Sequence, residues 1–348
     1  SRSAPRAAPT GQSAALGITV VAAAGNRGRN LLGQENYGTI SSPGNDPSVI
    51  TVGAVNYKDT IARADESVNF FSSRGPTRGS FVDASGVKRV DNLIKPDLVA
   101  PGNKILGAAA TSNSNSTWSL LPNLFYASLV APLNVPQPLF ETHMWMSGTS
   151  IAAPAVAGSV ALMLQANPGL TPPLVKAILQ YTAQPIAGAN LLQQGAGLLN
   201  VDGAIALSKS IRTDLATLVA SNGISSGASI VATGAAFPTA SSTINGQNFN
   251  WSRIVTIGGT RIVSGSALFT KYQPVWDPKI TWSGKVLKKR TPVYWSGSGI
   301  ASNTFVKSFT ETSPTSQALL SSGVVRADTL AGASSLVGKT GGFISSAT

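Results

Sequence analysis

Two short apolar runs, each bounded by turn-forming residues, constrain the fold of this chain more than any other feature. "GITVVAAAGN" (17–26) ends at Gly25 and Asn26, and "SVITVGAV" (48–55) follows the turn segment "SPGNDP". A continuous apolar run of this length is typical of a strand buried on both faces of a parallel sheet. In "KPDLVAPG" (95–102), prolines bracket a third, very short candidate strand. These runs predict a mostly parallel sheet.

Two helices are predicted downstream of these strands. "SIAAPAVAGSVALMLQANPGL" (150–170) is almost wholly apolar and small, so we expect a central helix that is packed on all sides. Pro154 fits its first turn, and the Asn-Pro-Gly cluster at 167–169 stops it. "TPPLVKAILQYTA" (171–183) predicts a second helix with Thr171 as its N-cap. Strands that alternate with helices indicate an α/β domain.

The chain changes character after about residue 208. The first part holds 13 basic and 10 acidic residues, a balance of +3, whereas the rest holds 13 and 4, a balance of +9. Alternating residues in "RIVTIGGTRIVSG" (253–265) predict a β-hairpin with a two-residue reversal at Gly258 and Gly259. We therefore expect a domain over 1–208 and a β-rich C-terminal extension over 209–348.

Composition restricts the chemistry of the chain. It has no cysteine, which excludes disulfides, thiolate metal sites and a cysteine nucleophile. Only 11% of the residues are charged, and a polar surface built from Ser, Thr, Asn and Gly favours a secreted, extracellular protein. No apolar run is expected to reach the length of about 18 residues that spans a bilayer, and the N-terminal arm lacks the apolar core of a signal peptide. We read Ser1 as a product of processing or as the first ordered residue of a longer chain.

The segment "MSGTSIAAP" (146–154) places Ser150 among small residues at an expected helix start. A serine there is either an N-cap or a nucleophile. Its backbone N–H would point outward at the positive end of the helix dipole and could stabilise an oxyanion. Asn26, at the carboxyl end of the first strand, is either a turn residue or a second donor to that oxyanion.

A serine nucleophile needs a general base, normally a histidine held by a carboxylate. The chain contains one histidine, His143, seven residues before Ser150. An extended segment of that length separates the two by up to roughly 23 Å. We expect His143 to be a loop or interface histidine rather than the base.

Six stretches in order resemble the subtilisin-like serine proteases, or subtilases, over roughly residues 17–208. "MSGTSIAAPAVAG" is similar to the nucleophile signature of that family and "VVAAAGN" to its oxyanion-hole signature; the other four are "SPGNDPSVITVGAV", "FFSSRGPT", "KPDLVAPG" and "QGAGLLNVDGAI". The resemblance implies a partial subtilisin-like parallel sheet flanked by helices, followed by the β-rich region. It also implies a serine endopeptidase with Ser150 as nucleophile and Asn26 in the oxyanion hole. No cofactor is required, and calcium is possible by resemblance, although no loop has its ligand spacing.

The chain also departs from the family pattern. The signatures that carry the catalytic Asp and His of subtilases are absent, and Ala155 stands where the family often has His. One hypothesis is a piece of an endopeptidase whose Asp and His come from a separate N-terminal fragment. The alternative is an inactive derivative that acts as an extracellular structural or self-assembling protein.

The expected partners follow from these two hypotheses. They are a protein or peptide substrate, and either the N-terminal fragment or further copies of the chain, in closed rings or filaments, that cover an edge strand at 18–24. Nucleic acid is not an expected partner. The "KVLKKR" run (285–290) is either a solvated basic turn or a segment that binds a polyanion or the cell surface. The insertion at 112–141 is a wall or cover of the substrate cleft, an interaction surface, or a surface excursion packed on its own side chains.

Overall fold

A computed structural model of the chain describes residues 13–278 with gaps, together with three short strands nearer the C-terminus. The gaps are 83–87, 91–92, 110–121, 123, 135–142, 258–260 and 265. The "KVLKKR" segment, the first twelve residues and parts of the 112–141 insertion therefore lie outside the description.

The fold is mixed α/β and is built on a small sheet whose central strand is β2 (Ile50–Asn56). Two strands lie parallel to β2 on its two sides, β1 (Val21–Ala23) and β6 (Leu98–Pro101), and β3 (Ser67–Val68) pairs antiparallel with its end. All three predicted strands are confirmed in position. Within the described residues β1 pairs with β2 alone, so β1 is an edge strand.

The remaining helices and strands lie outside this central sheet. The helices are α3 (Tyr126–Leu129), η2 (Ala131–Leu133), α4 (Thr149–Ala166), α5 (Pro172–Thr182), α6 (Leu191–Gln194), α7 (Val201–Lys209), α8 (Leu215–Ala220), η3 (Ser266–Phe269) and η4 (Pro274–Trp276). The antiparallel strand pairs are β4 (Ser80–Val82) with β5 (Lys88–Val90), β7 (Ile105–Ala108) with β8 (His143–Met146), β9 (Ser241–Ile244) with β10 (Gln247–Asn250), and β13 (Pro292–Val293) with β14 (Thr304–Phe305). A further sheet has the order β11 (Ile254–Ile257), β12 (Arg261–Ser264), β15 (Val325–Arg326).

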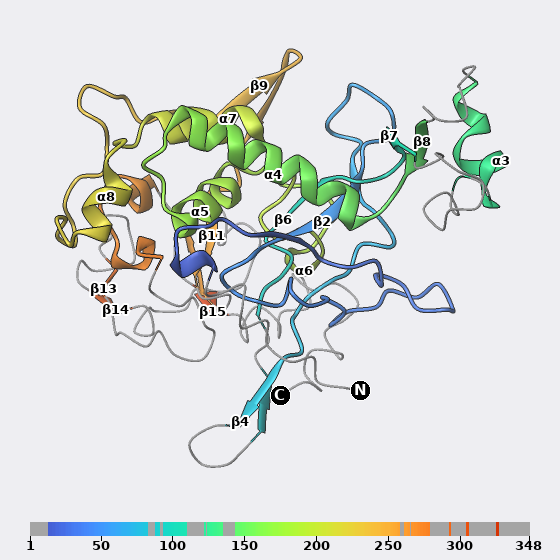
Figure 1. Ribbon diagram of the computed structural model, residues 1–348, viewed down its shortest axis with the longest axis horizontal. Helices are drawn as coiled ribbons and strands as arrows, with labels where there is room; N and C mark the ends of the chain where they lie inside the picture. Colours follow the sequence, from blue (N-terminus) through green and yellow to red (C-terminus); the bar gives the residue numbers. More distant parts are fainter. Residues whose placement is uncertain are drawn as a thin grey trace.

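Alternation along the strands separates the two faces of the central sheet. Side chains such as Val52 and Leu98 join the main core with α4, α5 and α7, whereas Val55 and Val99 face a smaller cluster with Ile186. Figure 1 shows α4 crossing β2 and β6, with α6 on the other side of these strands. The expected parallel sheet flanked by helices is therefore confirmed.

The strand β1 differs from its prediction in burial. It has only three residues, and Val21 and Ala23 are half-buried, whereas β2 and β6 are almost wholly buried. The prediction of burial on both faces is thus wrong for this strand. The physical reason is its place at the edge of the described sheet.

The long helix α4 is also less enclosed than predicted. It starts at Thr149 and stops before Asn167 as expected, and one side packs on β1, β2, β6 and α7. The prediction of packing on all sides is nevertheless wrong, because the other side is exposed and Leu162 is 46% accessible. The exposed residues of α4 are Ser150, Pro154, Ala155, Ala157, Gly158, Ala161, Leu162 and Gln165. When all sides of a helix are apolar, its sequence does not indicate which side packs against other elements.

This helix also corrects the expectation that no apolar run is long enough to span a bilayer. Among the described residues, α4 alone has the length, 18 residues, and the apolar composition for it. One third of those residues are buried inside the protein. The core helix of a soluble protein passes the same test, so this is weak evidence for a membrane span.

The helix α5 begins where the sequence predicts, although Thr171 acts differently. Thr171 occupies the N-cap position, but its side chain makes no capping bond. Its Oγ1 instead donates to the carbonyl oxygen of Trp276 at 2.7 Å. The hydroxyl therefore ties the start of α5 to a segment that is distant in sequence.

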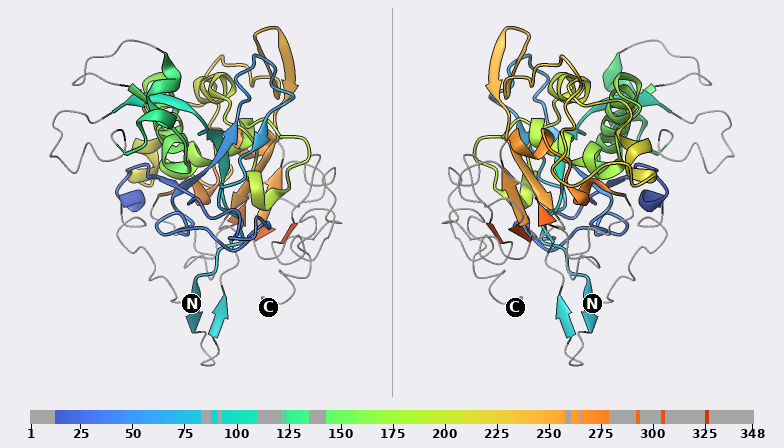
Figure 2. Two further views of the ribbon diagram at one scale, coloured as in Figure 1. Left: turned by 90° about the vertical axis from the view of Figure 1, so that its right-hand side faces the viewer. Right: turned by 90° about the vertical axis from the view of Figure 1, so that its left-hand side faces the viewer.

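The predicted hairpin in the C-terminal part is confirmed as β11 and β12. Its register pairs Ile257 with Arg261, which leaves three residues between the strands rather than the two expected. Buried apolar residues between Ile211 and Trp276 share the main apolar core with β2 and α4. The projecting β4–β5 pair and the β9–β10 pair lie at opposite ends of the molecule (Figure 2). The boundary at 208/209 stays a prediction.

A buried carboxylate with two lysines lies at the centre of this fold. Asp97 Oδ2 lies 2.7 Å from Lys95 Nζ, and its Oδ1 lies 3.0 Å from Lys176 Nζ. Asp97 also accepts hydrogen bonds from the Thr51 backbone and the Gln180 side chain. Burial raises the pKa of Asp97, but the attraction of Lys176 and Lys95 outweighs it and leaves that pKa lowered. The cluster thus connects β2, β6 and α5.

We predict that Asp97→Asn lowers the free energy of unfolding by about 3–5 kcal/mol, because it leaves two buried ammonium groups without their carboxylate. Urea denaturation measures the change. Asp202→Asn is the matched control, since Asp202 is exposed in the first turn of α7. A loss no larger than that of the control would contradict the structural role of the cluster.

We also predict that stability rises between about pH 7 and pH 10. Burial lowers the pKa of Lys95 to about 7, against the attraction of Asp97. A lysine in the unfolded chain keeps a pKa of about 10.4, so in this window the unfolded state binds more protons and loses stability relative to the folded state as pH rises. Lys95→Met should flatten the rise in urea midpoints, whereas exposed Lys209→Met should not. Equal slopes of urea midpoint against pH in wild type and Lys95→Met would refute the role of Lys95 in this rise.

Candidate active site

Ser150 is the second residue of α4 and is exposed. The N-cap of the helix is Gly148, with no side-chain capping bond, so the N-cap interpretation of Ser150 is wrong. Neither its hydroxyl nor its backbone N–H has a hydrogen-bond partner in the described part of the chain. Both groups therefore lie open at the positive end of the helix dipole.

Asn26 lies three residues beyond the end of β1 and reaches across to the start of α4. Its Oδ1 accepts hydrogen bonds from the Thr149 backbone N–H at 2.9 Å and from Thr149 Oγ1 at 3.0 Å. Thr149 Oγ1 in turn accepts from the Gly25 backbone N–H at 3.1 Å. Asn26 thus supplies, from outside the helix, the cap that Gly148 lacks.

This arrangement fixes the orientation of the Asn26 amide. Because Oδ1 is held by Thr149, the Nδ2 group is left as a donor, and no described residue accepts a hydrogen bond from it. It lies beside Gly148, where an added Cβ would be 3.3 Å from Nδ2. The same point lies 3.8 Å from the Ser150 backbone nitrogen, so two N–H donors, Asn26 Nδ2 and the Ser150 backbone, lie near one another at the start of α4. Such a pair can stabilise negative charge that develops on a carbonyl oxygen.

Two glycines permit this close approach. Gly25 has φ of +107°, and a Cβ there would lie 2.5 Å from Ser41 Oγ. Gly102, just after β6, accepts a hydrogen bond from the Gly148 N–H at 2.8 Å, and a Cβ there would be 2.8 Å from the Gly148 carbonyl oxygen. The turn before Ser150 is consequently anchored to both β1 and β6.

The structure places His143 in a strand that precedes this turn. His143 is the first residue of β8, is exposed, and pairs with Ala108 of β7. The strand then runs to Met146 before the chain reaches Gly148 and Ser150. Of the two alternatives, the loop histidine is wrong, because His143 lies in a strand, and the interface histidine stays a prediction. Three residues of strand place it about 10 Å from Met146.

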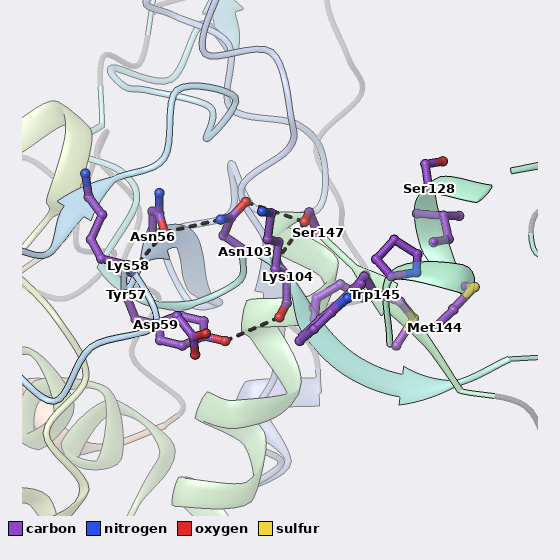
Figure 3. A pocket seen from close by; sticks show the side chains of 14 residues that line it. Asn56, Tyr57, Lys58, Asp59, Asn103, Lys104, Ser128, Met144, Trp145 and Ser147 are labelled. Atoms are coloured by element: carbon purple, nitrogen blue, oxygen red, sulfur yellow. Dashed lines mark hydrogen bonds between the residues drawn. The ribbon is translucent and has the colours of Figure 1, made fainter. Parts of the chain in front are cut away.

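A cavity of about 940 Å³ lies next to the start of α4 (Figure 3). Ser147 and Ile151, on either side of Ser150 in sequence, contribute to its wall. The other lining residues are Asn56, Tyr57, Lys58, Asp59, Asn103, Lys104, Ser128, Leu129, Pro132, Met144, Trp145 and Met146. Part of the 112–141 insertion, in α3 and η2, therefore forms one wall of the cavity.

Sequence reasoning did not identify Thr149 or the cavity residues. Thr149 lies within the quoted "MSGTS" segment, but its buried side chain acts through Gly25 and Asn26, which are more than 120 residues away. The apolar "HMWM" segment directly before that motif was the available signal for the cavity.

A metal site was tested on the donor set. Within the described residues, no group of three or more His, Asp or Glu side chains lies together in a way that could hold a metal ion. Calcium binding stays an expectation from the resemblance.

Three features define the class of this protein. They are the α/β sheet, the exposed serine at the start of a helix, and the asparagine amide near that serine. A model of the subtilase family matches residues 3–204, more than half of the chain. The chain therefore belongs to the subtilase family, as the sequence motifs indicate. Membership supports a serine peptidase function.

Several known proteins are similar to the chain. Serine protease AprX from Bacillus subtilis (strain 168) is 35% identical over 189 residues, which cover 54% of this chain and 35% of AprX. The membrane-bound transcription factor site-1 protease of Mus musculus is 28% identical over 53% of this chain and 13% of its own length. Fervidolysin from Fervidobacterium pennivorans, a solved structure, is 28% identical with a TM-score of 0.38, over 56% of this chain and 23% of its own. The chain thus spans about a third or less of each.

We predict that Thr149→Val destabilises the protein by about 1–3 kcal/mol, because the Gly25 N–H loses its acceptor and Asn26 loses a donor. Thr149→Ser keeps the hydroxyl and is the matched control. Urea denaturation of both variants measures the difference. If valine and serine behave alike, the hydroxyl does not hold Asn26 in place.

Proposed function

We propose that this chain supplies the nucleophile, Ser150, and an oxyanion-hole donor, Asn26, of a secreted subtilisin-like serine endopeptidase. The observation that carries the proposal is the bond from Thr149 to Asn26 Oδ1. It leaves Asn26 Nδ2 and the Ser150 N–H as open donors beside an exposed hydroxyl.

The chemistry follows from this placement. Ser150 Oγ attacks the carbonyl carbon of a peptide bond while a general base takes its proton. The carbonyl oxygen becomes an oxyanion and accepts hydrogen bonds from Asn26 Nδ2 and the Ser150 backbone. The base then gives its proton to the leaving amine as the C–N bond breaks. Water, activated by the same base, hydrolyses the acyl-serine and restores the hydroxyl.

We infer that the base, a histidine held by an aspartate, comes from an N-terminal piece outside these 348 residues. Two described features favour this over His143. The edge strand β1 has an open pairing side, and the exposed side of α4 presents apolar and small residues next to Ser150. A polypeptide that covers both would also bring a side chain toward the serine. Further copies of the chain are the alternative cover, and intact-mass analysis of native material distinguishes the two.

The substrate class that fits is protein or peptide. The low charge of the chain, 11% of residues, supports secretion. The absence of cysteine does not conflict with it. The competing proposal is an inactive derivative that serves as a structural or self-assembling protein. It has no need for the open donors at Asn26 and Ser150, which is why we favour the peptidase.

The proposal is tested on the chain assembled with the segment that carries the base. Ser150→Ala should abolish peptide hydrolysis, and Asn26→Ala should lower kcat by about 10² to 10³ with little change in KM. Asn248→Ala, exposed on β10, is the matched control and should behave as wild type. Hydrolysis that survives Ser150→Ala would overturn the proposal, and an unchanged kcat in Asn26→Ala would remove Asn26 from the oxyanion hole.

A further inference from the structure

We propose that one side of the molecule docks on the surface of a lipid bilayer rich in anionic lipids, through two projecting apolar tips. The first tip is the loop 28–36 that follows β1, and the second is α3 with the residues directly before it. Both project at the right in Figure 1, the loop in blue and α3 in green, and the left panel of Figure 2 faces this side. Docking of this kind requires no hydrolysis, so the inference does not depend on the proposed function.

The first tip presents the two most accessible large apolar side chains of the described residues. Leu31 is 107% accessible and Leu32 is 82% accessible. The Leu31 side chain is therefore as open to water as in an extended peptide. Single exposed leucines are ordinary on protein surfaces, but two adjacent ones on a projecting loop favour contact with another apolar phase.

Hydrogen bonds inside the loop hold its shape. Asn30 Oδ1 accepts from the backbone N–H groups of Leu32 and Gln34, each at 3.0 Å. At the base of the loop, Glu35 forms an ion pair of 2.8 Å with Arg74, which is buried. This framework consists of backbone and polar groups. Replacing the two leucine side chains therefore leaves it intact.

The second tip adds aromatic side chains. Leu124 and Phe125, just before α3, and Tyr126, at its start, are each more than half exposed. Between Lys104 and Glu141 the sequence contains no charged residue. Aromatic side chains favour the interface between lipid and water, and a segment without charges avoids the main cost of entering it.

Basic residues at the first tip match the headgroups of anionic lipids. Arg27 and Arg29 are exposed, and Arg29 lies over the exposed Phe70 ring, 5.5 Å from its centroid. The one acidic residue of the loop, Glu35, is already paired with Arg74. Guanidinium groups bind phosphate groups well, and each basic residue near an anionic bilayer strengthens binding. The formal charge of +12 attracts the chain to the same surface.

The shape of the two tips favours a bilayer over another protein. Protein interfaces are contiguous patches with an apolar centre and a polar rim. Here the apolar groups lie on two separate projections, with arginines at the base of one of them. A plane of lipid contacts both projections at once, and two contacts give stable membrane binding where one alone is marginal.

Vesicle sedimentation tests the proposal on the full chain, with any polypeptide that accompanies it in native material. The vesicles are pure phosphatidylcholine, or phosphatidylcholine and phosphatidylglycerol in equal amounts. We expect binding to the mixed vesicles and much weaker binding to the neutral ones. Leu31→Ser combined with Leu32→Ser should lower the partition coefficient at least about tenfold, because each leucine removed from water contributes about that factor. Arg27→Gln combined with Arg29→Gln should weaken binding to the mixed vesicles alone.

Leu16→Ser is the matched control, because Leu16 is 80% accessible. Its segment, the darkest blue in Figure 1, lies at the left and away from both tips. This variant should bind as wild type does. Absence of binding to the mixed vesicles would overturn the proposal. Equal binding by the double leucine variant and the control would also overturn it, since net charge alone would then account for the binding.

A second measurement locates the contact on the protein. Because the chain has no cysteine, Leu32→Cys, Phe125→Cys and Leu16→Cys each accept one environment-sensitive fluorophore. Mixed vesicles should shift the emission of the first two to shorter wavelength and leave that of Leu16→Cys unchanged. No shift at the first two positions would overturn the lipid contact. A shift produced there by an accompanying polypeptide without vesicles would identify a protein as the partner and would also overturn it.

Discussion

The buried carboxylate of Asp97 is the constraint on which the rest of the structure depends. A carboxylate without solvent is tolerated only when charged partners and hydrogen bonds surround it. Lys95 on the approach to β6, Lys176 on α5 and the Thr51 backbone on β2 supply these contacts, so three elements must meet at one point. Gln180 extends the network from α5 to Thr256 on β11 through a pair of hydrogen bonds. The C-terminal hairpin is thereby tied to the central sheet.

The site is placed by the same strands. Once β6 is fixed beside β2, the Gly102 carbonyl lies where it accepts from the Gly148 N–H, and α4 begins next to it. The strand β1 on the other side of β2 brings Asn26 to Thr149. Ser150 therefore sits where two parallel strands end and a helix begins, a position at which sheets of this kind place their sites. Its geometry follows from sheet register rather than from the loop sequence alone.

Sequence reasoning identified the elements with local signals and missed those that depend on distant partners. The strands at β2 and β6 and the start of α4 carry continuous apolar runs or a glycine-rich motif, which act over a few residues. The hydroxyl of Thr171 bonds to a carbonyl 105 residues away, and Thr149 joins two segments that no local pattern connects. The sequence did not predict the exposed side of α4, because apolar and small residues occur on every side of this helix. The cavity wall at Leu129 belongs to an insertion without periodicity.

The central claim is that Ser150 is a nucleophile whose general base comes from another polypeptide segment. The most direct measurement is labelling by a fluorophosphonate, with the modified residue located by mass spectrometry. The account predicts slow, unselective labelling of the chain alone, because an unactivated serine is a poor nucleophile at neutral pH, and rapid stoichiometric labelling of Ser150 once the base-bearing segment is present. Rapid stoichiometric labelling of Ser150 in the chain alone would contradict the account. His143 would then be the candidate general base.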